Sequence, residues 1–194
     1  IGVNRIYEKA ESIGVEFTQF SLPNLDLIED IIYQSKTDAG IDKDIKNAVE
    51  NKIGGDFNYN IKNTDRSVGA SSSGMIARTH GNYGMSENPI NIHFKGTAGQ
   101  SFGVWNAGGL NLTLEGDAND YVGKGMAAGQ ITVYPPKDTS YIAKESVIIG
   151  NTCMYGATGG KLYASGIAGE RFAVRNSGAI TVIEGCDSNA CEYM

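Results

Sequence analysis

One thirteen-residue stretch occurs twice in this chain. It reads GTAGQSFGVWNAG at 96–108 and GIAGERFAVRNSG at 166–178, so the two copies lie at a constant offset of 70 residues. Both fit the frame G-x-A-G-x-x-F-x-V-x-N-x-G without a gap. A frame of this kind indicates an internal structural repeat, and a repeat constrains the fold more strongly than composition does.

A shorter unit, a glycine followed by two apolar residues at alternate positions, also recurs. It begins at Gly108, Gly129, Gly160 and Gly178, at intervals of 21, 31 and 18 residues. The longest interval contains an insertion, PPKDTSYIAKES, at 135–146. Without about ten residues of this insertion the period is close to 20, which is typical of stacked units that bury their apolar faces against one another.

Alternating apolar pairs favour short strands, and the glycine before each pair favours a corner with positive φ. We therefore predict a β-solenoid with three coils per superrepeat. The glycines that we identify as structural residues of the repeat are Gly96, Gly99, Gly108, Gly129, Gly160, Gly166, Gly169 and Gly178.

The repeat sequences resemble a known family. GTAGQSFG, LEGDANDYVGKG, GQITVYPP, GNTCMYGATGGKLY, GIAGERFAVRNSGA and CEYM, together with NTDRSVG at 63–69, are similar to the C-terminal GXGXG domain of the glutamate synthase large subunit. The resemblance covers roughly residues 42–194. The fold we expect is mainly β, a single-stranded right-handed β-helix with a helical N-terminal segment. The expected domains are residues 1–57, the helical segment, and residues 58–194, the β-helix domain.

The resemblance implies a non-catalytic structural role. The family's large subunit carries a glutaminase with a cysteine nucleophile and a synthase barrel with FMN and an iron–sulfur cluster. Together these domains convert L-glutamine, 2-oxoglutarate and reductant into two L-glutamate. This stretch resembles none of the catalytic or cofactor-binding parts, so we expect it to pack against those domains and position them. The electron donor of the parent enzyme, NADPH, NADH or ferredoxin, is left open.

Two alternatives belong to other classes. The chain could be a β-helix subunit of another redox complex, such as formylmethanofuran dehydrogenase, but NTDRSVG and CEYM favour glutamate synthase. It could also be a polysaccharide-active β-helix enzyme. Such a site needs clustered acidic ligands and a projecting base, whereas most positions of the predicted coils carry Gly, Ala, Ser or Asn.

Apolar periodicity predicts the elements before the first repeat. Two amphipathic helices are expected at 6–13 and 25–32, and a third from Asp42 to Ile53, where Gly54 and Gly55 end it. Strands are expected over 57–61 and 90–94, with a short helix over 71–79 between them.

Composition excludes several classes of partner. The net charge of −6 argues against nucleic acid and anionic membranes as partners. No apolar run approaches the roughly 18 residues of a membrane span, and no signal peptide is evident. Three cysteines without a disulfide pattern favour a reducing compartment, for which the cytoplasm is the default.

Several clusters have both a functional and a structural interpretation. Asp117, Asn119 and Asp120 could bind Ca²⁺, but Asx residues beside glycine more often close turns. The run from Gly123 to Gly125 could cradle a phosphate, but the expected strand over 131–133 follows it instead of a helix.

The cysteines and histidines also favour structural roles. Cys186 and Cys191 lack the further ligands of a zinc or iron–sulfur site, and His80 and His93 lie on different predicted elements. We therefore predict no catalytic, cofactor-binding or metal-binding residue in this stretch.

Glu170, Arg171 and Arg175 form the most charged part of any predicted coil. Interdomain contact and a plain solvent-exposed rim are equally good interpretations of these residues. In addition, the β-helix is expected to be truncated at Met194, where an open coil would favour self-association or fraying.

Overall fold

The computed structural model describes residues 36–81 and 83–194 of the chain. The helices predicted at 6–13 and 25–32 lie outside the described residues. Helix α3, Lys36–Glu50, precedes strand β1, Gly55–Ile61, and helix α4, Ala70–His80. Helix α4 confirms the helix predicted over 71–79, and α3 confirms the helix predicted from Asp42, although α3 already begins at Lys36. Ile53 is not on the buried face, because α3 has ended and the side chain is 64% exposed.

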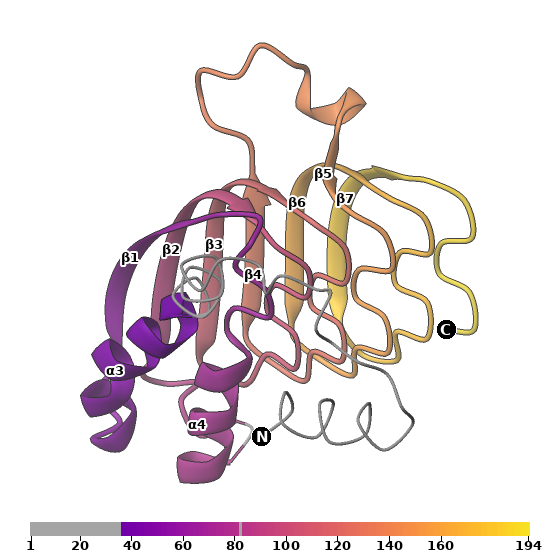
Figure 1. The fold of residues 1–194 in the computed structure, drawn as a ribbon. Coiled ribbons are helices and arrows are strands. Elements are labelled where there is room, and N and C mark those ends of the chain that lie inside the picture. The colour runs from indigo at the N-terminus through magenta and orange to yellow at the C-terminus, as the bar shows by residue number, and fades with distance from the viewer. Residues whose placement is uncertain (1–35, 82) are drawn as a thin grey trace, which may run out of the picture. The chain divides into compact units, whose positions relative to one another are not determined.

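The described residues form one parallel sheet of seven strands. Figure 1 shows these strands side by side. After β1 come β2, Ile90–Ala98; β3, Leu110–Ala118; β4, Gln130–Tyr134; β5, Val147–Ile149; β6, Lys161–Ala168; and β7, Ile180–Cys186. The pairing order is β1-β2-β3-β4-β6-β5, with β7 on β6 and β5 also pairing β3. Alternate residues of β1, β2, β3, β4 and β6 face the core, as the apolar pattern predicted. The apolar pattern did not predict β5, which buries Ile148 and Ile149 in succession.

This sheet corrects the predicted fold class, a single-stranded right-handed β-helix. The regular strands make one parallel sheet accompanied by α3 and α4, and the segments that return from one strand to the next are turns and loops. Every second residue of these segments has positive φ, as in Ser101, Gly103 and Trp105, at 65, 66 and 55°. Extended strands need negative φ, so the return segments form no further sheet.

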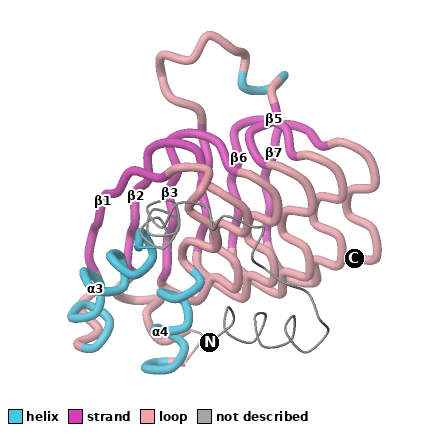
Figure 2. The backbone as a smooth tube through the Cα atoms, viewed as in Figure 1, coloured by secondary structure: helices cyan, strands magenta, loops and turns pink. Residues whose placement is uncertain are grey.

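The return segments nevertheless stack on one another, as Figure 2 shows. We call each return segment a row. Backbone N–H groups of one row donate to carbonyls of the row before it, at distances of 2.7–2.9 Å. The first of these bonds runs from Gly103 to Val68, and the last runs from Cys191 to Phe172. The residues shared by the two copies of the long frame are buried here. Phe102 and Phe172 fill the core, and Asn106 and Asn176 are the buried polar members.

The final strand departs from the predicted pattern. Ile180 and Val182 were predicted to face the core, but they align with Lys161 and Tyr163 and are 58% and 54% exposed. The two buried asparagines show why. Asn106 donates its side-chain N–H to the carbonyl of Leu110, four residues ahead, whereas Asn176 reaches Ala179, three residues ahead. The second turn is one residue shorter, and a one-residue shift moves every strand side chain to the other face.

Two hydrogen-bonded contacts hold the helices in place. Asp42 on α3 accepts bonds from the hydroxyls of Ser71 and Ser72 at the start of α4. Tyr59 of β1 donates to Asp44 of α3 at 2.8 Å. Partial burial, with this bond, raises the pKa of the Tyr59 phenol. No helix in the described ranges is long and apolar enough to cross a bilayer.

Candidate functional site

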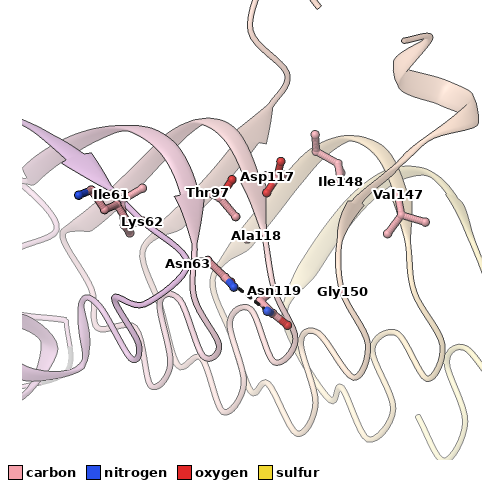
Figure 3. Close-up of a pocket in the computed structure, with 10 residues that line it drawn as sticks. All are labelled: Ile61, Lys62, Asn63, Thr97, Asp117, Ala118, Asn119, Val147, Ile148 and Gly150. Atoms are coloured by element: carbon pink, nitrogen blue, oxygen red, sulfur yellow. Dashed lines mark hydrogen bonds between the residues drawn. The ribbon is translucent and has the colours of Figure 1, made fainter. Parts of the chain in front are cut away.

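A hollow lies where strands β1 to β3 end, beside β5 (Figure 3). Its volume is about 670 Å³. Two glycines let neighbouring strands approach closely beside this hollow. A Cβ on Gly96 would lie 2.1 Å from the carbonyl oxygen of Ile61, and a Cβ on Gly116 would lie 1.8 Å from the carbonyl oxygen of Gly96. Polar side chains therefore emerge together at the carboxyl ends of neighbouring parallel strands.

These side chains can make polar contacts with a ligand or partner. Asn119 donates to the side-chain oxygen of Asn63 at 3.0 Å, as the dashed line in Figure 3 marks. Lys62 and Asp117 supply one charge of each sign, and Val147 adds an exposed apolar side chain. The hollow can thus accept hydrogen-bonding groups, but it brings no histidine or cysteine to the lining.

The Asx cluster mainly closes turns. Asn119 accepts a bond from the backbone N–H of Asp120 at 2.8 Å, and Asp120 accepts one from the backbone of Asn151 at 2.7 Å. Asp117 lines the hollow described above. Within the described residues, no three His, Cys, Asp or Glu side chains form a group that could hold a metal ion. The turn interpretation is therefore the one that the hydrogen bonds support.

The run Gly123-Lys124-Gly125 has its backbone N–H groups in use. Gly123 donates to Phe102 at 2.9 Å and Gly125 to Tyr155 at 2.8 Å, while the Lys124 ammonium lies 5.4 Å from the centre of the Tyr121 ring. A phosphate cradle needs free N–H groups that converge on the anion. These two groups instead join neighbouring rows.

The cysteines and histidines are spread over separate elements. Cys153 is buried, whereas Cys186 and Cys191 are exposed, and all three are free thiols. Burial raises the pKa of the Cys153 thiol to about 12. His80, at the end of α4, contacts the carbonyl of Val49 at 2.5 Å, and His93 lies exposed on β2.

Most of the predicted repeat glycines lie where rows approach closely. An added Cβ on seven of them would come within 3 Å of a neighbouring segment: Gly96, Gly99, Gly129, Gly160, Gly166, Gly169 and Gly178. The positive φ predicted for the glycine before each apolar pair is found at Gly129 and Gly160. It is wrong for Gly108 and Gly178, since the turn after the first frame has its positive φ of 85° at Gly109.

Glu170, Arg171 and Arg175 are exposed on the return rows. Backbone hydrogen bonds place Arg175 in one column with four other residues, which we name the outer column: Trp105, Gly125, Gly156, Arg175 and Tyr193. The exposed Trp105 had not been predicted as a site residue. Its signal in the sequence is that the only tryptophan of the chain occupies a variable position of the long frame, where the second copy has Arg175.

These features together define a glycine-rich domain of stacked parallel repeats. The family model of the GXGXG motif matches residues 38–194, and the chain therefore belongs to the GXGXG family.

Its relatives are glutamate synthases, which confirms the resemblance. The ferredoxin-dependent glutamate synthase 2 of Synechocystis sp. is 53% identical over 153 residues, which are 79% of this chain and 10% of that protein. The glutamate synthase [NADPH] large chain of Azospirillum brasilense is 53% identical over 136 residues, 70% of this chain and 9% of that protein. The chain thus spans about a tenth of the length of these relatives.

Proposed function

We propose that the chain is a non-catalytic structural domain of a glutamate synthase. It packs against the glutaminase and FMN/iron–sulfur synthase domains of the same large subunit and holds their relative position. The complete protein converts L-glutamine, 2-oxoglutarate and reductant into two L-glutamate. The chain itself binds none of the cofactors. The three free cysteines support a reducing compartment such as the cytoplasm.

The observation that carries this proposal is the continuous stack of return rows. Backbone hydrogen bonds link each row to the next from Val68 to Cys191, beside the parallel sheet. In a stack of this kind each row is fixed by its neighbours, so surfaces at the two ends keep a fixed separation. A stack with exposed charged and aromatic side chains on its rim is suited to positioning other domains.

The proposal can be tested by restoring activity in trans. A glutamate synthase that lacks only this segment is expected to lose glutamine-dependent glutamate formation and to regain it when this chain is added. Addition of a Gly116→Val chain, whose corner cannot form, serves as the control and should restore nothing. If the truncated synthase is fully active alone, or if the wild-type chain restores no activity, the positioning role is wrong.

The isolated chain gives a second test. It should purify colourless and should not release ammonia from glutamine, because Cys153 is buried with its pKa raised and no nucleophile motif surrounds Cys186 or Cys191 in the sequence. A flavin spectrum that survives gel filtration, or measurable glutaminase activity, contradicts the proposal.

A further inference from the structure

The outer column contains a gap that the fold itself does not require. Gly125 and Gly156 have φ of 63°, close to the 55–57° of Trp105, Arg175 and Tyr193 in the same column. Three side-chain-bearing residues therefore occupy this backbone conformation, and φ alone does not demand glycine at the other two positions.

Crowding explains one of the two glycines and leaves the other unexplained. A Cβ on Gly125 would lie 2.8 Å from Cδ1 of Trp105, so the indole lies against this glycine. A Cβ on Gly156 would meet nothing within 4 Å. Hydrogen-bonded rows lie about 5 Å apart. The space over Gly156 is therefore open, and its neighbours in the outer column are Gly125, against which the indole lies, and Arg175. We name this open space the slot.

Trp105 and Arg175, which belong to the same column, are of the types that contribute most binding energy in protein interfaces. Trp105 is 65% exposed, and exposed tryptophan and arginine are the side chains most enriched among interface hot spots. The ion pairs found in the described residues are Lys46–Glu50 and Lys95–Glu115, so Arg175 belongs to neither. Its guanidinium can therefore bind a carboxylate, and the planar indole can pack against a neighbouring apolar or aromatic side chain.

We propose that the slot binds an extended acidic segment supplied by the rest of the glutamate synthase polypeptide. A carboxylate of that segment meets Arg175, and an adjacent side chain fills the space over Gly156 against Trp105. Glu170 lies on the same return row as Arg171 and Arg175, and Glu192 lies on the next row, where its carbonyl accepts from the backbone of Arg175. The segment therefore needs a carboxylate placed at Arg175 and not merely a high negative charge. This inference rests on the proposed packing role and names the chemistry of one contact.

Trp105 provides the readout, because it is the only tryptophan in the chain. The probe is a synthetic peptide with the sequence Gly-Ser-Glu-Phe-Glu-Ser-Gly and blocked ends, and the comparison peptide carries Lys in place of both Glu. A tethered segment has an effective concentration of the order of millimolar, so binding of the free peptide near 1 mM suffices. The acidic peptide should change the Trp105 emission saturably, and the basic peptide should not.

Three variants sharpen the test. Gly156→Tyr fills the slot with a side chain that this column accepts at Tyr193, and Arg175→Glu reverses the charge of a neighbour in the outer column. Each should weaken binding at least tenfold. Arg175→Glu should leave the melting temperature nearly unchanged, whereas Gly156→Tyr, at a φ of 63°, should lower it by several degrees and still leave the chain folded. Arg171→Glu makes the same charge change in a neighbouring column and should keep binding within about threefold.

Three outcomes contradict the proposed binding at the slot. They are equal binding of both peptides, no binding of the acidic peptide by the wild-type chain, and unchanged binding by Gly156→Tyr and Arg175→Glu. The restoration assay separates this failure from failure of the packing role. If both variants restore activity as well as the wild-type chain does and the peptide does not bind, the packing role stands without the slot. If the wild-type chain restores nothing, the packing role itself fails, whatever the peptide does.

Discussion

Cys153 illustrates how burial controls side-chain chemistry in this chain. Its thiol donates to the carbonyl of Gly150 at 3.2 Å inside the core. Burial removes water from the thiolate, which raises the pKa to about 12. Cys186 and Cys191 are exposed. The three thiols therefore differ in reactivity although their sequence contexts show no nucleophile motif.

We expect two of the three thiols to react with Ellman's reagent in the native chain at pH 8, and the third only after unfolding. Cys153→Ala should leave the native count at two, whereas Cys186→Ala should lower it to one. A native count of three would show that the core opens readily or that Cys153 is not buried.

The raised pKa of Cys153 also predicts a loss of stability at alkaline pH. An unfolded thiol has a pKa of about 8.5, whereas the folded one has about 12. Above about pH 8.5 the unfolded state loses a proton that the folded state keeps, so the stability from this group is present below that pH and falls towards pH 12. Urea unfolding from pH 8 to 11 should therefore show a steeper decline for the wild-type chain than for Cys153→Ala. Equal slopes would contradict the shift.

Gly116 and Gly81 separate two reasons for needing glycine. Both have positive φ, 153° and 76°, but a Cβ on Gly116 would lie 1.8 Å from the carbonyl of Gly96, whereas one on Gly81 would meet nothing within 4 Å. Positive φ alone costs about 1–3 kcal/mol for other residues. Thermal unfolding of Gly116→Ala should therefore show a much larger loss than Gly81→Ala, and equal losses would mean that the backbones can separate.

At the scale of elements, strand β7 differs most from its predicted environment. The turn before it is one residue shorter than the turn before β3, so Ile180 and Val182 face outward. Among the described strands β7 pairs only with β6, which leaves its other edge open. An open edge strand with apolar side chains favours pairing with another chain.

We expect the isolated chain to associate in a concentration-dependent way through β7. Val182→Lys should reduce this association, because a charge on an edge strand opposes pairing. Thr113→Lys, which faces outward in the middle of the sheet on β3, is the matched control and should not. Sedimentation velocity over a range of concentrations measures the effect, and a strictly monomeric wild-type chain would rule out the self-association that we propose here.

At the scale of the described molecule, stability is shared between neighbouring rows. Strand β3 pairs with β2, β4 and β5 and has buried residues at alternate positions throughout, whereas β7 has one partner and no fully buried residue. A stack in which each repeat contacts only its neighbours loosens first at its ends.

Hydrogen exchange on a dilute sample should therefore show slow exchange in Leu110–Ala118 and fast exchange in Ile180–Cys186. A dilute sample is used because weak association does not occur at low concentration. The difference in exchange rate between the two strands then reflects their position within one chain and not contacts between chains. Equal protection of both strands would mean that the chain unfolds in a single step and that β7 is as firmly held as the centre.

The sequence alone determined which segments become strands and which positions are buried in most of them. Alternation of apolar residues predicted β1, β2, β3, β4 and β6 but not the short β5, and the shared Phe and Asn of the long frame mark residues that the structure buries. These features are local, because a strand with one buried face needs an apolar residue at every second position. The family was likewise evident from the repeat residues alone.

Only the tertiary structure decided the rest. Whether the return segments form strands depends on backbone φ values that residues other than glycine also adopt here, as Trp105 and Arg175 show. The orientation of β7 depends on a turn length that the shared frame conceals. The open space over Gly156 depends on three rows that are far apart in sequence. Each of these results from contacts between rows, and such contacts exist only once the rows have stacked.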